Sequence, residues 1–141
     1  MRKRSTLFAF PALFHLCIVP FPAAAQSAPP TSCDQYGGYE LENCLKTALS
    51  SADDALNAAY KNAQAAIEAD ADTSSADKKT WQVNLLAAER AWIAFRDANC
   101  KFELIGAEWH DGSGTTSAQQ ACVLALTLQR SDELTKRYDP N

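Results

Sequence analysis

The stretch from Trp81 to Phe102 constrains the fold of this chain more than any other part of its sequence. Apolar or small residues recur in it at spacings of four, three, four, three and then seven, the pattern of one face of a long α-helix. These residues are Trp81, Leu85, Ala88, Trp92, Phe95 and Phe102. Other helices must cover such a seam.

A second seam precedes the first, in a segment that contains no proline or glycine. It predicts a helix over residues 39–69, with its apolar residues at Leu45, Leu49, Ala52, Leu56, Ala59 or Tyr60, Ala63 and Ile67. Residues 70–77 are rich in aspartate, serine and threonine, which predicts a solvated turn. Ser74, with Asp77 three residues later, is placed to cap the following helix.

Two further helices follow from the same reasoning. The stretch with the Trp81 seam predicts a helix over residues 76–105, which Gly106 ends. A third helix is expected over residues 117–138, nearly apolar at its start and charged at its end. The predicted fold is all-α: a small antiparallel three-helix bundle with two long helices, in which a shorter third helix fills the groove of the hairpin.

The first 25 residues have the pattern of a secretory signal peptide. A basic start at Arg2–Arg4 precedes an apolar run that is too short to span a bilayer, and Ala23–Ala25 offers a cleavage site. Cys17 lies inside the apolar run, so neither lipidation nor a membrane anchor after cleavage is expected. We therefore predict a signal peptide (1–25), a flexible leader (26–32) and one helical domain (33–141), in a periplasmic or secreted protein.

Charge narrows the class of partner. Of the 13 basic residues three lie in the signal peptide, so the cleaved chain would carry 10 against 17 acidic residues, a net charge of about −7. That balance argues against nucleic acids and anionic membranes as partners. It favours a basic protein.

Four cysteines remain after cleavage, an even number in an oxidising compartment, which predicts two disulfides. Cys100 near the end of the second helix and Cys122 near the start of the third would lie at one level in an antiparallel pair. We favour Cys100–Cys122 with Cys33–Cys44. Cys44 also lies near that end of the bundle, so the pairing of Cys44 with Cys100 and of Cys33 with Cys122 stays open.

Motifs for enzyme chemistry are mostly missing. The cleaved chain has one histidine, His110, which excludes the usual multi-histidine zinc sites and Cys-His-Asp arrangements within one chain. Asp70, Asp72 and Ser74 imitate the start of a calcium loop but lack its glycine and its glutamate. We expect no catalytic residue, no metal and no cofactor.

Polar residues on the predicted helices allow two interpretations. Asn57 and Tyr60 share one helix face, as do Trp92 and Arg96 on the second helix and Thr127 and Arg130 on the third. They would form either a ligand site or a packing network. In the network, which we favour, Arg96 lies flat against Trp92 or Tyr60, Asp53 or Glu89 neutralises it, and Asn57 and Thr127 satisfy the remaining donors.

The loop between the second and third helices differs from the helices in composition. It presents Trp109, His110, Asp111 and Ser113 around a Gly-Ser-Gly segment, which is typical of a recognition loop. The alternative is a tight connection whose Trp109 folds back on the end of the bundle.

Several of these residues resemble a known family, the bacterial exported domain named for the lysozyme inhibitor LprI. The resemblance rests on Leu56-Asn57-x-x-Tyr60, Trp92-Ile93-x-x-Arg96-Asp97-x-x-Cys100, Gly112-Ser113, and Cys122 followed by Thr127-x-x-Arg130, and it extends from about Cys33 to Leu134. Glu89 departs from the family pattern, which often has glutamine there.

The resemblance implies an exported protein, not an enzyme, that binds and blocks a basic lysozyme. Our hypothesis is that the loop Trp109–Ser117 enters the catalytic cleft as a plug that the enzyme cannot cleave. The competing hypothesis is a periplasmic structural or adaptor protein that binds another envelope protein through a bundle face. An unrecognised hydrolase is a third hypothesis.

Overall fold

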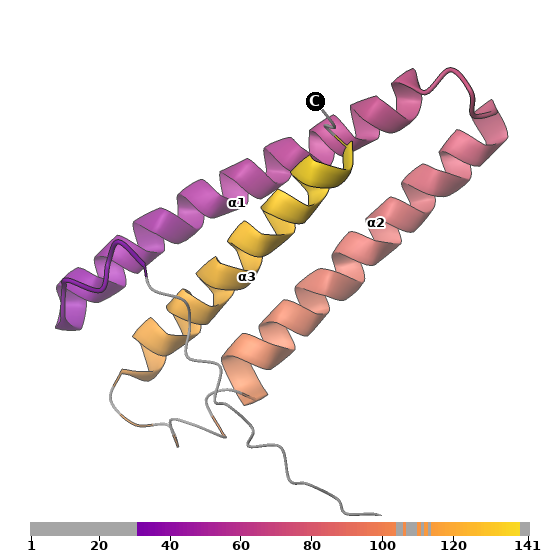
Figure 1. Cartoon of the computed structure of the whole chain (residues 1–141). Helices are drawn as coiled ribbons and strands as arrows, with labels where there is room; N and C mark the ends of the chain where they lie inside the picture. The colour runs from indigo at the N-terminus through magenta and orange to yellow at the C-terminus, as the bar shows by residue number, and fades with distance from the viewer. Residues whose placement is uncertain (1–30, 104–105, 107–109, 111, 113, 139–141) are drawn as a thin grey trace, which may run out of the picture.

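Three helices make up the protein in the computed structural model, which describes residues 31–103, 106, 110, 112 and 114–138 (Figure 1). They are α1 (Gly38–Ala69), α2 (Ser75–Ala98) and α3 (Thr115–Tyr138), and a π-helical turn, η1 (Asn99–Glu103), continues α2. No strand occurs among these residues. The predicted all-α fold, with long helices, a shorter third helix and two disulfides, is confirmed. The predicted signal peptide and most of the leader lie outside the described residues.

The ends of the helices have local causes. α1 begins where Gly38 adopts a positive φ of 54°, which glycine tolerates because it has no Cβ. After α1, the Asp70 carboxylate accepts a hydrogen bond from the backbone N–H of Asp72, 2.9 Å away, and turns the chain. The Ser74 hydroxyl then accepts from the backbone N–H of Asp77, at 3.2 Å, so the predicted cap of α2 is confirmed.

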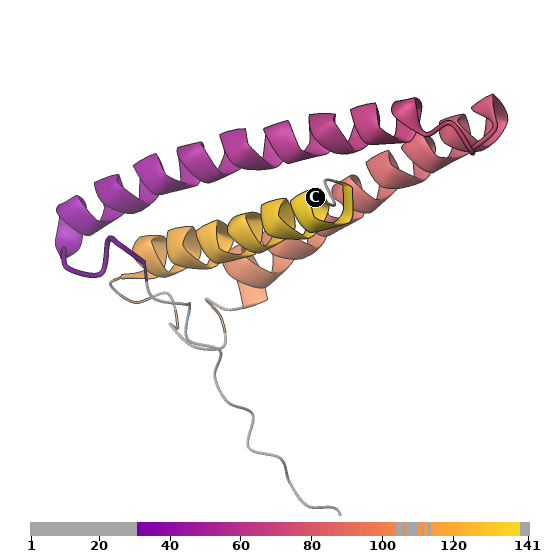
Figure 2. The same ribbon diagram turned by 45° about the horizontal axis from the view of Figure 1, so that its top comes forward.

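The helices are ordered in space so that α3 lies between α1 and α2 (Figure 1). α1 and α3 run in the same direction and lie side by side, which a second view also shows (Figure 2). The pairing of α1 with α3 is the most extensive in the fold, and α2 packs less closely. α3 therefore fills the groove of the hairpin, as expected, but it packs mainly against α1.

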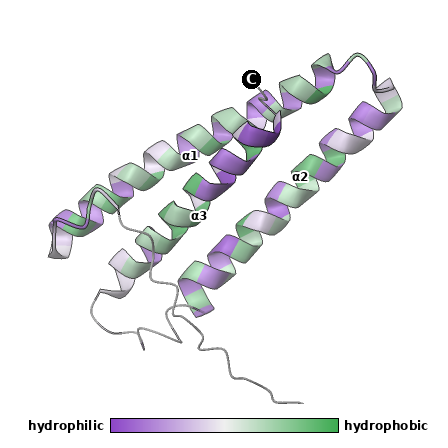
Figure 3. Ribbon diagram, viewed as in Figure 1, coloured by the Kyte–Doolittle hydropathy of each residue, from purple (hydrophilic) through white to green (hydrophobic). Residues whose placement is uncertain are grey.

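Small side chains allow α1 and α3 to approach each other closely. Toward the hairpin turn, the core consists of Leu56, Ala59, Ala63, Ile67, Leu85 and Leu134, with Tyr60, Trp92 and Tyr138 packed against it. Toward the other end it consists of Cys33, Leu45, Ala52 and Leu124, with Leu41, Cys44, Ala48, Leu49 and Ala121 around it. The predicted seam of the first helix is thus confirmed. Figure 3 shows α3 pale in its first turn, mostly green in its middle and mostly purple toward its C-terminal end, so the predicted apolar stretch lies inside the helix and the predicted charged end follows it.

The predicted seam of α2 is only half right. Leu85 is buried and Trp92 is half-buried, but Ala88 is exposed, and 56% of Phe95 and 73% of Phe102 are exposed. Trp81 is 38% exposed. The reason is that α2 has neighbours on one side only, so a helix face wide enough to include Phe95 extends beyond what α1 and α3 cover.

Both disulfides lie at the end of the bundle away from the hairpin turn. Cys33 bonds Cys44, with 5.6 Å between their Cα atoms, and Cys100 bonds Cys122, with 5.5 Å. These are the pairs that we favoured from the sequence. No helix in the described part of the chain is long and apolar enough to cross a membrane.

Candidate functional site

A ladder of side-chain contacts joins α2 to α3, and most of the polar residues singled out from the sequence belong to it or border it. Going from the disulfide end toward the hairpin turn, the partners advance along α3 as they retreat along α2, as antiparallel helices require. The four contacts of this α2–α3 ladder are Cys100–Cys122, Arg96–Thr127, Glu89–Arg130 and Trp81–Tyr138. Three of these contacts are made by long side chains, so α2 lies farther from α3 than α1 does.

Arg130 and Glu89 form the most buried ion pair among the described residues. Arg130 Nε donates to Glu89 Oε1 at 3.0 Å, its Nη2 donates to the same oxygen, and its Nη1 donates to Glu133 Oε2 at 3.0 Å. The side chains of Arg130 and Glu89 are 10% and 11% exposed. The hydrogen bond with Glu89 and then that with Glu133 raise the pKa of Arg130 against the opposing effect of burial. The guanidinium therefore stays charged and paired.

Arg96 connects all three helices. Its guanidinium carbon lies 5.2 Å from the centroid of the Trp92 ring, and its Nη1 donates to Thr127 Oγ1 on α3 at 3.2 Å. The same Nη1 lies 3.7 Å from the Asp53 carboxylate on α1. These three contacts are the ones that the packing interpretation predicted. Glu89, its other predicted partner, binds Arg130 instead.

Asp97 completes the surroundings of Arg96. One carboxylate oxygen accepts from Arg96 Nε and Nη2, at 3.2 and 3.1 Å, and the other lies 3.1 Å from Lys101 Nζ. Burial tends to raise the pKa of Asp97, but the hydrogen bonds from Lys101 and Arg96 outweigh it and hold the pKa below its ordinary value. Asp97 therefore serves the network as a fixed anion.

Two of the candidate residues lie apart from this network. Asn57 is exposed and makes none of the hydrogen bonds of the ladder. Tyr60 is half-buried and packs against the hydrophobic cluster near the hairpin turn. The ligand site imagined between Asn57, Tyr60 and the arginines is thus not assembled.

The recognition loop is described only in part. His110 is exposed, in a turn with a positive φ of 46°, while Trp109, Asp111 and Ser113 lie outside the described residues. The disulfide Cys100–Cys122 joins the two elements from which the loop departs, η1 and α3. The role of the loop stays a prediction.

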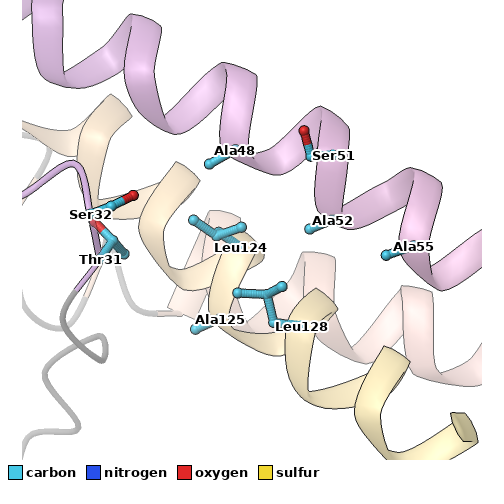
Figure 4. A pocket seen from close by; sticks show the side chains of 9 residues that line it. All are labelled: Thr31, Ser32, Ala48, Ser51, Ala52, Ala55, Leu124, Ala125 and Leu128. Carbon is cyan, nitrogen blue, oxygen red and sulfur yellow. The ribbon is translucent and has the colours of Figure 1, made fainter.

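A groove between α1 and α3 was not foreseen. It has a volume of about 520 Å³ and is lined by Thr31, Ser32, Ala48, Ser51, Ala52, Ala55, Leu124, Ala125 and Leu128 (Figure 4). The signal in the sequence was the run of alanines and serines that flanks the first seam, which leaves space beside the leucines of α3. None of the described residues that line the groove carries a charge.

The chemistry available in these sites is that of packing and binding. In the described residues, no group of three or more histidine, cysteine, aspartate or glutamate side chains is placed to hold a metal ion. The buried charges, Glu89 and Arg130, neutralise each other, and Thr127 donates its hydroxyl to the backbone carbonyl of Val123 at 2.7 Å. The ladder therefore stabilises the bundle.

Comparisons with known proteins place this fold in a family. The chain is 33% identical to the uncharacterized protein R02472 of Rhizobium meliloti (strain 1021) over 135 residues, which cover 89% of this chain and 91% of that protein. It is 32% identical to the uncharacterized protein YecT of Escherichia coli (strain K12) over 97 residues, covering 67% of this chain and 60% of YecT. No solved structure matches the chain. The family model for the lysozyme inhibitor LprI matches residues 32–134, and the chain therefore belongs to the LprI lysozyme-inhibitor family.

Proposed function

We propose that this protein is exported and that it binds and blocks a basic lysozyme. The observation that carries the proposal is the match of the LprI family model to residues 32–134, which takes in all but the last turn of the helical domain. Inhibition needs a stable binding surface and no reacting group. The network around Arg96 and the two disulfides hold the helices in place, which keeps such a surface stable.

The inhibitory element in this proposal is the predicted loop Trp109–Ser117, whose last three residues, Thr115–Ser117, form the first turn of α3 in the structure. Its support is geometric: η1 ends at Glu103, α3 begins at Thr115, and the disulfide Cys100–Cys122 fixes the two ends of the loop against each other. A loop held at both ends loses less entropy when it enters a cleft. The exposed His110 lies on this loop.

Charge supports the choice of a basic target. With the signal peptide removed, the chain would carry about −7. Attraction between an acidic inhibitor and a basic enzyme raises the association rate and weakens as salt screens the charges. We expect the association rate constant to fall as ionic strength rises, with a smaller change in the dissociation rate constant.

The test is the clearing of a cell-wall suspension by several lysozymes, with and without the purified exported protein. The double variant W109A/D111A should inhibit less than the natural protein. The variant Y39A/D72A, which removes an exposed aromatic side chain at the start of α1 and an exposed acid in the turn after α1, is the matched control. Equal inhibition by all three proteins would remove the loop from the proposal.

The second function, an adaptor that binds another envelope protein, has one observation in its favour: α2 leaves a broad apolar face exposed. If the natural protein slows none of the lysozymes, and one envelope protein binds it in a purified two-component assay, the adaptor function replaces the inhibitor function.

Export has its own test. We propose cleavage after Ala25 and a periplasmic or secreted location, which the two disulfides favour because such bonds persist in oxidising compartments. Mass spectrometry of the protein recovered outside the cytoplasm should show Gln26 as the first residue. A retained Met1 in that fraction would contradict cleavage.

A further inference from the structure

The outer face of α2 is apolar although no described element covers it. Exposed fractions on α2 are 58% for Val83, 39% for Leu86, 44% for Ile93 and 56% for Phe95. Among the exposed residues between Val83 and Ala98, Arg90 is the one charged side chain. In Figures 1 and 2, α2 lies at the edge of the bundle, with α3 on one side and no helix beyond it. An apolar face of this extent usually marks an interaction surface.

Small residues form a line along this face. The spacing of four, three and four residues places them on one stripe of the helix. These exposed residues are Ala87, Ala91, Ala94 and Ala98. Two helices that meet along such stripes can approach closely, because no long side chain separates their backbones. Phe95, beside the stripe, then has room to pack on the partner helix.

The stripe is symmetric about its own centre, which suits a second copy of the same helix as its partner. If a second α2 runs antiparallel about a two-fold axis between Ala91 and Ala94, each of these residues faces the other across the interface, and Ala87 faces Ala98. Such an interface is self-complementary, as a two-fold dimer requires. Phe95 of each copy then lies over the small side chain of Ala88 of the other.

Charge complements this arrangement. Arg90 and Asp97 are seven residues apart and lie on the same side of the stripe, so the two-fold axis brings Arg90 of each copy toward Asp97 of the other. Arg90 is exposed and has no ion pair with any described residue. The Asp97 side chain is 32% exposed, so its carboxylate stays within reach while it binds Arg96 and Lys101.

From the exposed apolar face, the alanine stripe and the placement of Arg90 and Asp97, we infer that this protein forms a homodimer through antiparallel packing of the outer faces of α2. The test of this dimer is the oligomeric state of the protein, which is measured without any lysozyme. The inference is therefore independent of lysozyme inhibition, and either can fail without the other.

Sedimentation equilibrium of the purified, disulfide-bonded protein tests the dimer. We expect a reversible monomer–dimer equilibrium in the micromolar range, and Ala91→Glu or Ala94→Glu should raise the dimer dissociation constant by about tenfold or more, because each places two carboxylates in an apolar contact. Ala58→Glu, which adds the same charge at an exposed alanine of α1, should leave the constant unchanged. Circular dichroism shows whether each variant keeps its helices.

The register is tested by cross-linking. Under oxidising conditions, an equal mixture of the variants Ala91→Cys and Ala94→Cys, each with one cysteine added to the two native disulfides, should form a cross-linked dimer faster than either variant alone. A protein that stays monomeric up to millimolar concentration, or a dimer that Ala91→Glu and Ala94→Glu leave intact, would overturn the inference. Faster cross-linking of each variant alone would overturn the antiparallel register.

Discussion

Two arginines hold α2 to the rest of the bundle, and they do so in different environments. Arg130 is buried and faces Glu89, whereas Arg96 lies over the Trp92 ring and shares partners that are partly exposed. A charge that is buried with its partner is costly to separate from that partner, because the remaining charge stays away from water. The two networks should therefore differ in their response to mutation.

The first prediction concerns the buried pair. Replacing Glu89 with alanine should lower the free energy of unfolding by about 3 kcal/mol, because Arg130 is then left with one carboxylate that is partly exposed. The control Glu133→Ala removes that other carboxylate, whose side chain is 42% exposed, and should cost about 1 kcal/mol or less. Urea unfolding followed by circular dichroism measures both. Equal losses would show that burial does not set the strength of this network.

Glu89→Gln separates charge from hydrogen bonding at the same position. Glutamine keeps an acceptor for Arg130 and matches the residue that the family often has there. Its loss in unfolding free energy should lie between those of Glu133→Ala and Glu89→Ala.

The second prediction concerns pH. The pKa of Asp97 is lower in the folded protein than its ordinary value of 3.8, so its contribution to stability is fully present above that value. The contribution is lost as the pH falls from 3.8 through the lowered pKa, because the folded state must then take up the proton. The unfolding free energies of the natural protein and of Asp97→Asn should differ at pH 6 and converge in strong acid. A constant difference over this range would contradict the role of the charge.

The sequence predicts the contact of Arg96 with Trp92 more directly than the contact of Arg130 with Glu89, for a physical reason. Trp92 precedes Arg96 by one helical turn, so their contact is local and follows from helix geometry alone. The pair of Glu89 with Arg130 joins residues 41 positions apart. Its prediction requires the register between α2 and α3, which the helix pattern leaves open.

At the scale of the helices, α1 and α2 illustrate what a seam does and does not specify. The seam of α1 is narrow and rich in alanine, and all its predicted members are buried or half-buried. The seam of α2 is aromatic and broad, and half of it remains exposed. Periodicity predicts that a helix has an apolar face but does not predict how many neighbours will cover that face. The apolar pattern predicted one helix over residues 76–105 and did not reveal that the α-helix ends at Ala98 and continues as the π-turn η1.

The third prediction tests the close contact of α1 with α3. Ala63 is fully buried, so Ala63→Leu must push the two helices apart and should cost about 2 kcal/mol or more of unfolding free energy. Ala65→Leu, at an exposed position two residues further along α1, is the matched control and should change the stability by less than about 0.5 kcal/mol. Denaturant unfolding compares the two. A small loss for both variants would mean that the interface is loosely packed.

At the scale of the whole molecule, the two disulfides have different tasks. Cys33–Cys44 joins residues 11 positions apart and folds the segment before α1 back on that helix. Cys100–Cys122 joins residues 22 positions apart and is the covalent contact of the ladder between α2 and α3. The sequence limited the pairing to two alternatives, because both require only that the four cysteines meet at one end of the bundle.

The fourth prediction follows from this difference. The double variant C100S/C122S should lose about 3 kcal/mol of unfolding free energy and C33S/C44S somewhat less, since a longer closed loop restricts the unfolded chain more. Hydrogen exchange should also rise first in α2 for C100S/C122S, because that helix then depends on the three noncovalent contacts of the ladder. Uniform exchange along all three helices would indicate that α2 does not separate from the bundle.

The side-by-side placement of α1 and α3 has a consequence for how the chain matures. α1 finds its main partner only after α2 and α3 have both been synthesised, because the two paired helices stand at opposite ends of the domain. Contacts between such distant segments form late and slowly. In the export that we propose, the chain crosses a membrane as an extended polymer, and the delay is then an advantage because the most tightly packed helix pair assembles only when the passage is nearly over.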